Sequence, residues 1–214
     1  MEHTVMHGTV SQKIGRVIVN LISHPQYISR CFAHNVINGK TPLDLEVPWF
    51  SYAAIDFLEK FVQPHMSVFE FGSGGSTLFF ARRARKVFSV EDNPSWFEWV
   101  THRLEEKGLT NAQLRLCPFN FKDPVGFENS DYLRAMPDET FDVLVIDGSE
   151  EWTHVRPVCF ELAESRVRKG GIIVVDDSWR YPGLRQNHRA KDLKIFQSVG
   201  PCRPGVTSTD VFFY

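Results

Sequence analysis

Two short runs of apolar residues constrain the fold of this chain more than any other feature of its sequence. They are Val143-Leu144-Val145-Ile146 and Ile172-Ile173-Val174-Val175, and no polar side chain interrupts either run. A strand that is apolar on both sides must be covered on both sides, which is typical of a parallel sheet between two layers of helices. We therefore predict an α/β fold built around such a sheet.

Strands and helices are expected to alternate from residue 67 onward. The expected strands cover 67–71, 86–91, 112–117, 141–146 and 171–176, and the helices cover 75–84, 94–107, 129–136 and 151–168. Two more strands, at 193–198 and 208–213, have no helix between them, so they should form an antiparallel hairpin. The sequence thus predicts a Rossmann-like, mostly parallel, doubly wound sheet that ends in a C-terminal hairpin.

Residues 1–45 differ from the rest of the chain, and we expect them to form an N-terminal helical extension to a domain at 46–214. Apolar side chains at helical spacing predict one helix over about residues 9–23 and a second, short one near 27–32. A further helix should begin near Pro48, because proline suits the first position of a helix. The extension has three open interpretations: packing against the main domain, a lid, or a homodimer interface.

The bulk properties limit the class of protein. The chain of 214 residues is long enough for one large core without disulfide bonds or metals. Its net charge of -2 gives no reason to expect binding to nucleic acid or to an anionic membrane, and no apolar run reaches the length of a membrane span. The four cysteines form no C-x-x-C pair, which favours reduced thiols and a cytoplasmic location.

A glycine-rich turn follows the first expected strand. Glu70 stands at the end of that strand, and Gly72 and Gly74 come shortly after it. Glycine lets the backbone take positive φ and approach a ligand closely, while free N–H groups at the start of the next helix attract an anion. The turn therefore predicts a ligand with an anionic end and groups that a carboxylate can hold, as in a nucleoside-type cofactor.

Carboxylates also follow the other strands. Glu91 ends the second strand, Asp147 follows the fourth, and Asp176 and Asp177 follow the fifth. In an open α/β sheet, ligands bind beyond the carboxyl ends of the strands, so these side chains should share one rim. Glu91 is well placed there to accept hydrogen bonds from both ribose hydroxyls of a nucleoside.

Two cofactor families are compatible with a glycine turn of this kind. A nicotinamide site is one, but the turn matches its G-x-G-x-x-G/A fingerprint only loosely. The acid before G-x-G (Glu70), the acid after the second strand (Glu91) and the terminal hairpin together resemble the class I S-adenosylmethionine-dependent methyltransferases. The resemblance covers about residues 48–214 and implies a seven-stranded sheet in which only the last-inserted strand is antiparallel.

The resemblance implies that S-adenosylmethionine binds at the glycine turn. Gly72 and Gly74 would let the backbone approach the cofactor closely, and Ser73 and Ser76 would hold its carboxylate end. Capping of the following helix is an equally open interpretation of the two serines.

Three more positions take a cofactor role from the same resemblance. Glu70 would lie near the amino-acid part of S-adenosylmethionine, Glu91 would bind its ribose, and Cys117, at the end of the third strand, would approach its adenine. Alternatively, the acid at the end of the second strand only marks the start of the next helix. Asp92 suits that role better than Glu91.

Asp147, Asp176 and Asp177 resemble a second and narrower pattern, that of the catechol and caffeoyl-CoA type O-methyltransferases. Those enzymes bind a divalent cation with an Asp after strand four and an Asp-Asn pair after strand five. The resemblance implies a Mg²⁺ or Mn²⁺ site at the three aspartates, where the cation would lower the pKa of a substrate hydroxyl. Alternatively, Asp147 contacts the cofactor while Asp176 or Asp177 caps a loop.

The match to that pattern is incomplete. Asp177 stands where that family has Asn, and the family's lysine near the strand-four Asp has no counterpart in the residues after Asp147. Proton removal would then fall to His154 or Glu150, or to direct activation by the cation. Asp147 and His154 are therefore the candidate catalytic residues.

Aromatic and basic side chains complete the expected site. Trp49, Trp152, Trp179 and Tyr181 lie near the predicted rim in sequence and would suit a flat or apolar acceptor, although ordinary packing explains them equally well. The basic stretch 180–191 would either attract an anionic acceptor or form a solvated linker.

The sequence as a whole predicts an enzyme that uses S-adenosylmethionine to methylate an oxygen of a small-molecule acceptor, with or without a divalent cation. Two alternatives stay open. One is a catalytically silent protein that binds S-adenosylmethionine and acts through a partner. The other is transfer of a different group on the same fold, as in the aminopropyl transferases.

Overall fold

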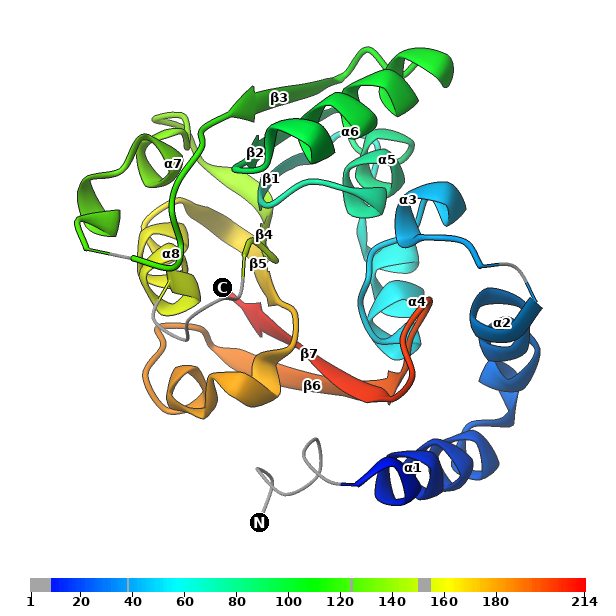
Figure 1. The fold of residues 1–214 in the computed structure, drawn as a ribbon. Coiled ribbons are helices and arrows are strands. Elements are labelled where there is room, and N and C mark those ends of the chain that lie inside the picture. Colours follow the sequence, from blue (N-terminus) through cyan, green and yellow to red (C-terminus); the bar gives the residue numbers. More distant parts are fainter. Residues whose placement is uncertain (1–8, 38, 124, 150–154) are drawn as a thin grey trace.

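A computed structural model of the chain contains one seven-stranded sheet with helices on both faces (Figure 1). It describes residues 9–37, 39–123, 125–149 and 155–214. The strands are β1 (Ser67–Phe71), β2 (Lys86–Glu91), β3 (Ala112–Leu116), β4 (Phe141–Ile146), β5 (Val167–Val175), β6 (Asp192–Val199) and β7 (Val206–Phe213). The predicted fold class is thereby confirmed.

The order of the strands in the sheet is β3-β2-β1-β4-β5-β7-β6. β1 pairs in parallel with β2 and β4, β5 pairs in parallel with β4, and β7 pairs antiparallel with β5 and β6. Only β7 therefore runs against the other strands, as the resemblance implies. Because β6 runs with the majority, the loop after β6 lies at the same edge of the sheet as the glycine turn.

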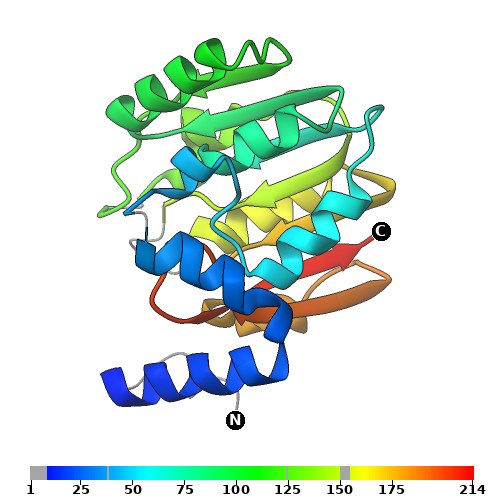
Figure 2. The same cartoon turned by 90° about the vertical axis from the view of Figure 1, so that its right-hand side faces the viewer.

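Helices cover both faces of the sheet (Figures 1 and 2), and two apolar clusters fill the space between the helices and the strands. One face is covered by α4 (Tyr52–Phe61), α5 (Gly75–Ala81) and α6 (Pro94–Glu106), and the other by α7 (Asp131–Arg134) and α8 (Val155–Glu164). Alternation along β1 shows how the strands serve both layers: Val68 packs in the first cluster, and Phe69 and Phe71 pack in the second.

Capping residues decide where two of the helices begin. α4 begins at Tyr52 and not near Pro48, because the Ser51 hydroxyl accepts a hydrogen bond from the Ala54 N–H at 3.3 Å. A short helix that the sequence did not predict, α3 (Pro42–Leu45), is capped reciprocally by Thr41 and Asp44. Short 3-10 turns follow β5 at Ser178–Arg180 and Pro182–Arg185.

The N-terminal part of the chain packs on the same core as the rest. α1 (Val10–Ser23) and α2 (Ile28–Phe32) lie near the predicted positions, and Tyr27 between them is buried in the first cluster. The Asn20 side chain of α1 accepts a hydrogen bond from the Val199 N–H at 3.1 Å. On its opposite side, α1 exposes Ile14, Ile18 and Ile22. The division near residue 45 and a homodimer through these helices stay predictions. No helix in the described ranges is long and apolar enough to span a bilayer.

Candidate functional site

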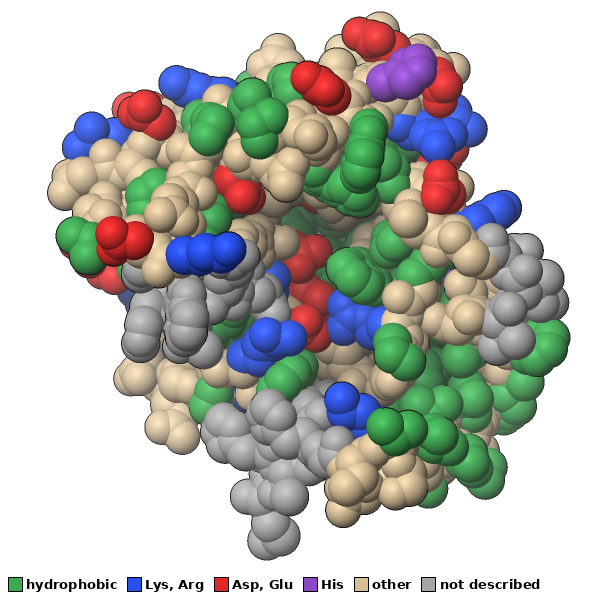
Figure 3. Space-filling view, in the orientation of Figure 1, with side chains coloured by type: hydrophobic (Ala, Val, Ile, Leu, Met, Phe, Trp, Pro, Cys, Tyr) green, Lys and Arg blue, Asp and Glu red, His purple; other side chains and the backbone are tan. Residues whose placement is uncertain are grey.

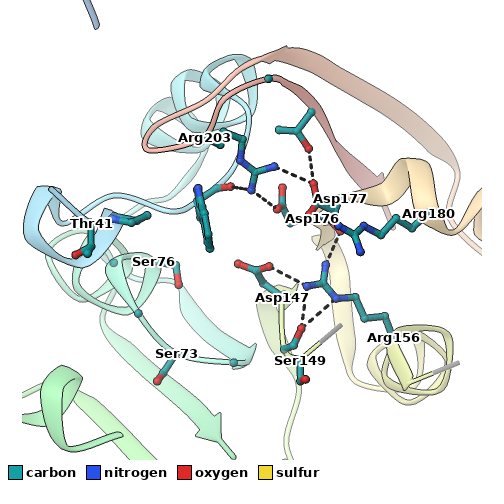
Figure 4. A pocket seen from close by; sticks show the side chains of 18 of the residues that line it. Thr41, Ser73, Ser76, Asp147, Ser149, Arg156, Asp176, Asp177, Arg180 and Arg203 are labelled. Carbon is teal, nitrogen blue, oxygen red and sulfur yellow. Dashed lines mark hydrogen bonds and ion pairs between the residues drawn. The ribbon is translucent and has the colours of Figure 1, made fainter. Parts of the chain in front are cut away.

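A cavity of about 910 Å³ opens at the edge of the sheet where β1, β2, β4 and β5 end. The space-filling view shows a hollow with acidic side chains at its centre and basic ones beside them (Figure 3). We call one part the glycine half, lined by 72–76, Glu91, Asp92 and Trp96. The tryptophan half is lined by Lys13, Arg16, Trp49, Trp179, Arg180 and 203–207. Asp147 lies between the two halves (Figure 4).

The backbone requires glycine at position 72. Its φ is +96°, and a Cβ there would come within 2.8 Å of the carbonyl oxygen of Asp147. The Gly72 N–H donates to the Val90 carbonyl at 2.9 Å. The glycine turn is thus packed against the end of β4, and two of the predicted site residues, Gly72 and Asp147, are neighbours.

Glu91 holds the glycine turn in shape. One of its carboxylate oxygens accepts hydrogen bonds from the Ser73 N–H at 3.1 Å and the Ser73 hydroxyl at 2.7 Å. The other accepts from the N–H groups of Asp92 at 3.1 Å and Asn93 at 2.9 Å. On the other side of the turn, the Trp96 indole donates to the Ser73 carbonyl at 2.7 Å. The turn therefore keeps its form through side chains of the protein itself.

The capping interpretation of the two serines does not describe the structure. The Gly74 N–H at the start of α5 donates to the Thr77 hydroxyl at 3.1 Å, and the Ser73 hydroxyl is bound to Glu91. Ser76 lines the cavity with Ser73. Their predicted role in holding the carboxylate end of the cofactor stays a prediction.

Two of the predicted cofactor residues lie behind the cavity wall. Glu70 accepts hydrogen bonds from the hydroxyls of Thr77 at 2.8 Å and Ser89 at 2.7 Å, beneath the glycine turn. Burial raises the pKa of Glu70 to about 7. Cys117 is buried, and its N–H donates to the Glu91 carbonyl at 2.8 Å. Neither side chain belongs to the described lining of the cavity.

Asp147 is paired with a buried arginine that the sequence analysis missed. Arg156, at the start of α8, donates to the Asp147 carboxylate at 3.2 Å and to the carbonyls of Gly148 at 2.8 Å and Asp176 at 2.6 Å. Burial and the nearby charge of Asp176 raise the pKa of Asp147 above its usual range, and Arg156 opposes that rise. The Asp147 carboxylate, 26% exposed, faces the cavity (Figure 4).

A second arginine, Arg203, binds both aspartates that follow β5. Its guanidinium donates to Asp177 at 2.8 Å and to Asp176 at 3.3 Å. Burial raises the pKa of Asp176 to about 7, with Arg203 opposing the rise. Burial also acts on Asp177, but Arg203 and the Thr207 hydroxyl outweigh it and hold the pKa of Asp177 below its usual value.

The three aspartates do not fit the divalent cation that the narrower resemblance implies. Within the described ranges, no three His, Cys, Asp or Glu side chains form a group that could hold a metal ion. The physical reason is that N–H and O–H donors occupy the carboxylates: Arg156 at Asp147, Arg203 and Thr209 at Asp176, and Arg203 and Thr207 at Asp177. The predicted ligand set is therefore a set of ion pairs. The predicted base His154 and its alternative Glu150 lie outside the described residues.

The aromatic and basic residues near the rim divide by role. Trp49 and Trp179 line the cavity, Tyr181 is buried behind it, and Trp152 lies outside the described ranges. Of the basic stretch, Arg180 lines the cavity. Arg185 instead pairs with Asp210 at 2.7 Å, which ties that part of the stretch to the sheet.

The missed arginines differ in whether the sequence carried a signal for them. Arg203 lies in the loop between β6 and β7, and a strand parallel to the majority must end at the ligand edge, so its loop was a candidate. Arg156 had no such signal, because its role depends on how α8 approaches the sheet.

Comparison with known proteins supplies evidence on the family. A family model described as a methyltransferase domain matches residues 69–178, more than half of the 214-residue chain. No curated protein matches the chain.

Solved structures share the fold. An rRNA methylase from Streptococcus thermophilus is 17% identical with a TM-score of 0.57, covering 83% of this chain and 99% of that one. A candidate O-methyltransferase from Klebsiella pneumoniae is 16% identical with a TM-score of 0.59, covering 94% and 98%. A candidate methyltransferase from Streptococcus mutans, solved in complex with SAH, is 12% identical with a TM-score of 0.57, covering 82% and 99%.

Proposed function

The chain belongs to the methyltransferase domain family and is an S-adenosylmethionine-dependent methyltransferase, and we propose that it methylates a hydroxyl oxygen of a small acceptor molecule. The observation that carries the proposal is that one cavity is lined by the glycine half, by Asp147 and by Trp49 and Trp179. A methyl donor in the first half and an acceptor in the second would meet beside Asp147.

The glycine half suits S-adenosylmethionine. Gly72 lets the backbone turn tightly at the cavity wall, and Ser73 and Ser76 offer polar groups there. Glu91 stands at the end of β2, where a ribose hydroxyl would replace the Ser73 hydroxyl on its carboxylate. The Streptococcus mutans protein with this fold holds SAH, the product form of this cofactor. When bound, S-adenosylmethionine supplies an electrophilic methyl group, and the electron pair of the broken C–S bond stays on sulfur.

Asp147 is the proposed general base. The proton of the acceptor O–H passes to the Asp147 carboxylate while an oxygen lone pair forms the new C–O bond. Arg156 binds one oxygen of that carboxylate at 3.2 Å and so fixes its orientation toward the cavity. Because the transfer is a displacement in line, most of the acceleration comes from holding the oxygen and the methyl carbon in position.

The tryptophan half limits the class of acceptor. Trp49 and Trp179 offer flat apolar walls to an aromatic or aliphatic molecule. Lys13 and Arg16 of α1 add positive charge to the same half and favour an acceptor with an anionic group. A small hydroxylated acid combines these properties.

The test uses Asp147→Asn, which keeps the shape of the side chain and removes the base. Transfer of labelled methyl groups to a panel of hydroxylated aromatic and aliphatic acids should fall by about 10²–10⁴-fold in kcat. Calorimetry with SAH should give nearly the same Kd as for the wild type, because the change leaves the glycine half in place. Asp138→Asn, an exposed carboxylate paired with Arg166 and not part of the described cavity lining, is the charge-matched control.

Three results would contradict the proposal. Full activity in Asp147→Asn would show that Asp147 is not the general base. Binding of SAH without transfer to any acceptor in the panel would instead support the catalytically silent alternative, and mass analysis of the products would reveal transfer of a group larger than methyl.

A further inference from the structure

Arg203 binds two of the three aspartates at which the narrower resemblance places a metal ion. We propose that the Arg203 guanidinium is the fixed cation of this site, so that the enzyme works without a divalent metal and accepts molecules with a single hydroxyl group that lack a second, chelating oxygen. The inference rests on the proposed function for the identity of the reaction, and on the ion pairs themselves for the replacement of the metal.

One guanidinium bridges two carboxylates. The Nη1 atom of Arg203 lies 2.8 Å from an oxygen of Asp177, and Nη2 lies 3.3 Å from an oxygen of Asp176. A planar, permanently charged fork is well suited to such a bridge. Two threonine hydroxyls donate to the same pair of aspartates, Thr209 to Asp176 at 2.7 Å and Thr207 to Asp177 at 2.5 Å.

The surroundings hold the guanidinium in place. The Arg203 side chain is only 14% exposed, and it also donates to the carbonyl of Trp49 and lies over the ring of that residue, 5.3 Å from its centre. The loop that carries it is fastened from outside: the Arg203 N–H donates to the Asn35 side chain at 2.7 Å, and Asn35 donates to the Gly200 carbonyl at 3.2 Å. Arg203 is therefore a built-in part of the cavity and not a loose surface charge.

Electrostatics and coordination chemistry both oppose a second cation here. Mg²⁺ requires near-octahedral oxygen ligands, whereas the oxygens of these aspartates already accept N–H and O–H donors. A divalent ion would also lie next to the like charges of Arg203 and Arg156 in a buried site, where charge repulsion is poorly screened. For the metal to enter, Arg203 would have to leave.

The replacement changes what the acceptor must offer. A metal ion activates a hydroxyl by direct coordination, and it binds an acceptor more tightly when a neighbouring oxygen completes the chelate. A guanidinium already bound to Asp176 and Asp177 offers no open coordination position. It acts instead by holding these two carboxylates in place beside Asp147. Acceptors with one hydroxyl should then serve as well as vicinal diols.

The experiment compares the full-length wild type with Arg203→Met and Arg203→Lys. Mn²⁺ binding is measured by electron paramagnetic resonance, and methyl transfer is measured with EDTA, with added Mg²⁺, and on 4-hydroxybenzoate against 3,4-dihydroxybenzoate. We expect no stoichiometric Mn²⁺ site in the wild type, no loss of activity in EDTA and comparable kcat/KM for the two acceptors. Arg203→Met should lose activity by about 10–100-fold and gain Mn²⁺ binding, because Asp176 and Asp177 lose their cation, and Arg203→Lys should restore part of the activity without Mn²⁺ binding.

The control for a merely structural effect is Arg185→Met. Arg185 has the same exposure, 14%, and pairs with a buried carboxylate, Asp210, outside the cavity lining. Its loss should lower stability without creating a Mn²⁺ site. Mn²⁺ bound stoichiometrically by the wild type, activity lost on chelation, or full activity in Arg203→Met would each overturn the inference. If no variant transfers methyl groups, the proposed function fails, and the Mn²⁺ titrations alone still decide whether Arg203 replaces the metal.

Discussion

Glu70 lies at the base of the glycine turn with one carboxylate oxygen that accepts no hydrogen bond from any described residue. Burial raises its pKa to about 7, and the hydroxyls of Ser89, Ser76 and Thr77 only partly oppose that rise. In the folded protein this carboxyl group therefore keeps its proton to a much higher pH than in an unfolded chain, where its pKa is near 4.5. The residue thus links the stability of the turn to pH.

The sign of that link can be predicted. A raised carboxyl pKa contributes stability that is present below pH ~4.5 and is lost as the pH rises through ~7, by on the order of 3 kcal/mol at most. Glu70→Gln cannot ionise, so its free energy of unfolding should fall less than that of the wild type between pH 5 and 8. Urea unfolding of both proteins at several pH values measures the difference, and parallel pH profiles would contradict the pKa shift. Comparing the two proteins cancels the contribution of Asp176 and Asp147, which act in the same direction.

At the scale of elements, the hairpin of β6 and β7 connects the N-terminal part of the chain to the cavity. Its loop carries Arg203 inward, while Asn35, which follows α2, holds the loop from outside through two hydrogen bonds. The side chain of α1 residue Asn20 meets the same hairpin at Val199. The extension is therefore in contact with the element that completes the tryptophan half.

Loss of the two Asn35 hydrogen bonds should lower the rate of methyl transfer. Asn35→Ala leaves the Arg203 N–H and the Gly200 carbonyl without their partner, so the free energy of unfolding should fall by about 1–3 kcal/mol. The value of kcat should also fall, but by less than in Arg203→Met. Asn111→Ala is the matched control, since Asn111 donates to the carbonyls of Ala81 and Ala84 away from the cavity. Thermal unfolding and steady-state kinetics on both variants make the comparison. Equal kinetic effects in the two would show that lost stability, and not the position of the loop, is responsible.

At the scale of the whole molecule, a bound cofactor should stabilise the folded state against unfolding. The glycine half joins β1, β2, α5 and α6, so a ligand bound there is lost when the sheet unfolds. At a concentration of about 100 times its Kd, SAH should add about 2.7 kcal/mol of stability and raise Tm by roughly 5–10 °C for a chain of this size. Differential scanning fluorimetry measures the shift, and a shift with NADH but not with SAH would contradict the assigned cofactor.

The sequence predicted the sheet and its ligand edge well, because apolar runs and glycine turns are local signals. The same locality explains what was missed. Arg203 meets Asp176 from 27 positions away and Asn35 from 168, and the periodicity of neither segment reports such a pairing. The burial of Glu70 could have been predicted from the sequence. Side chains alternate along β1, so a residue between Phe69 and Phe71 must point to the opposite face, beneath α5.

The two halves of the cavity also differ in how much of the chain they use. The glycine half comes from one compact stretch, 72–96, whose parts hold one another through Glu91 and Trp96. The tryptophan half is assembled from four distant places: α1, Trp49, the turn after β5 and the loop after β6. We therefore expect substitutions in the second group to disturb the first less than substitutions within 72–96 would. For directed evolution, libraries confined to 13–16, 179–180 and 204–206 should therefore change which acceptor is used while the affinity for SAH stays constant.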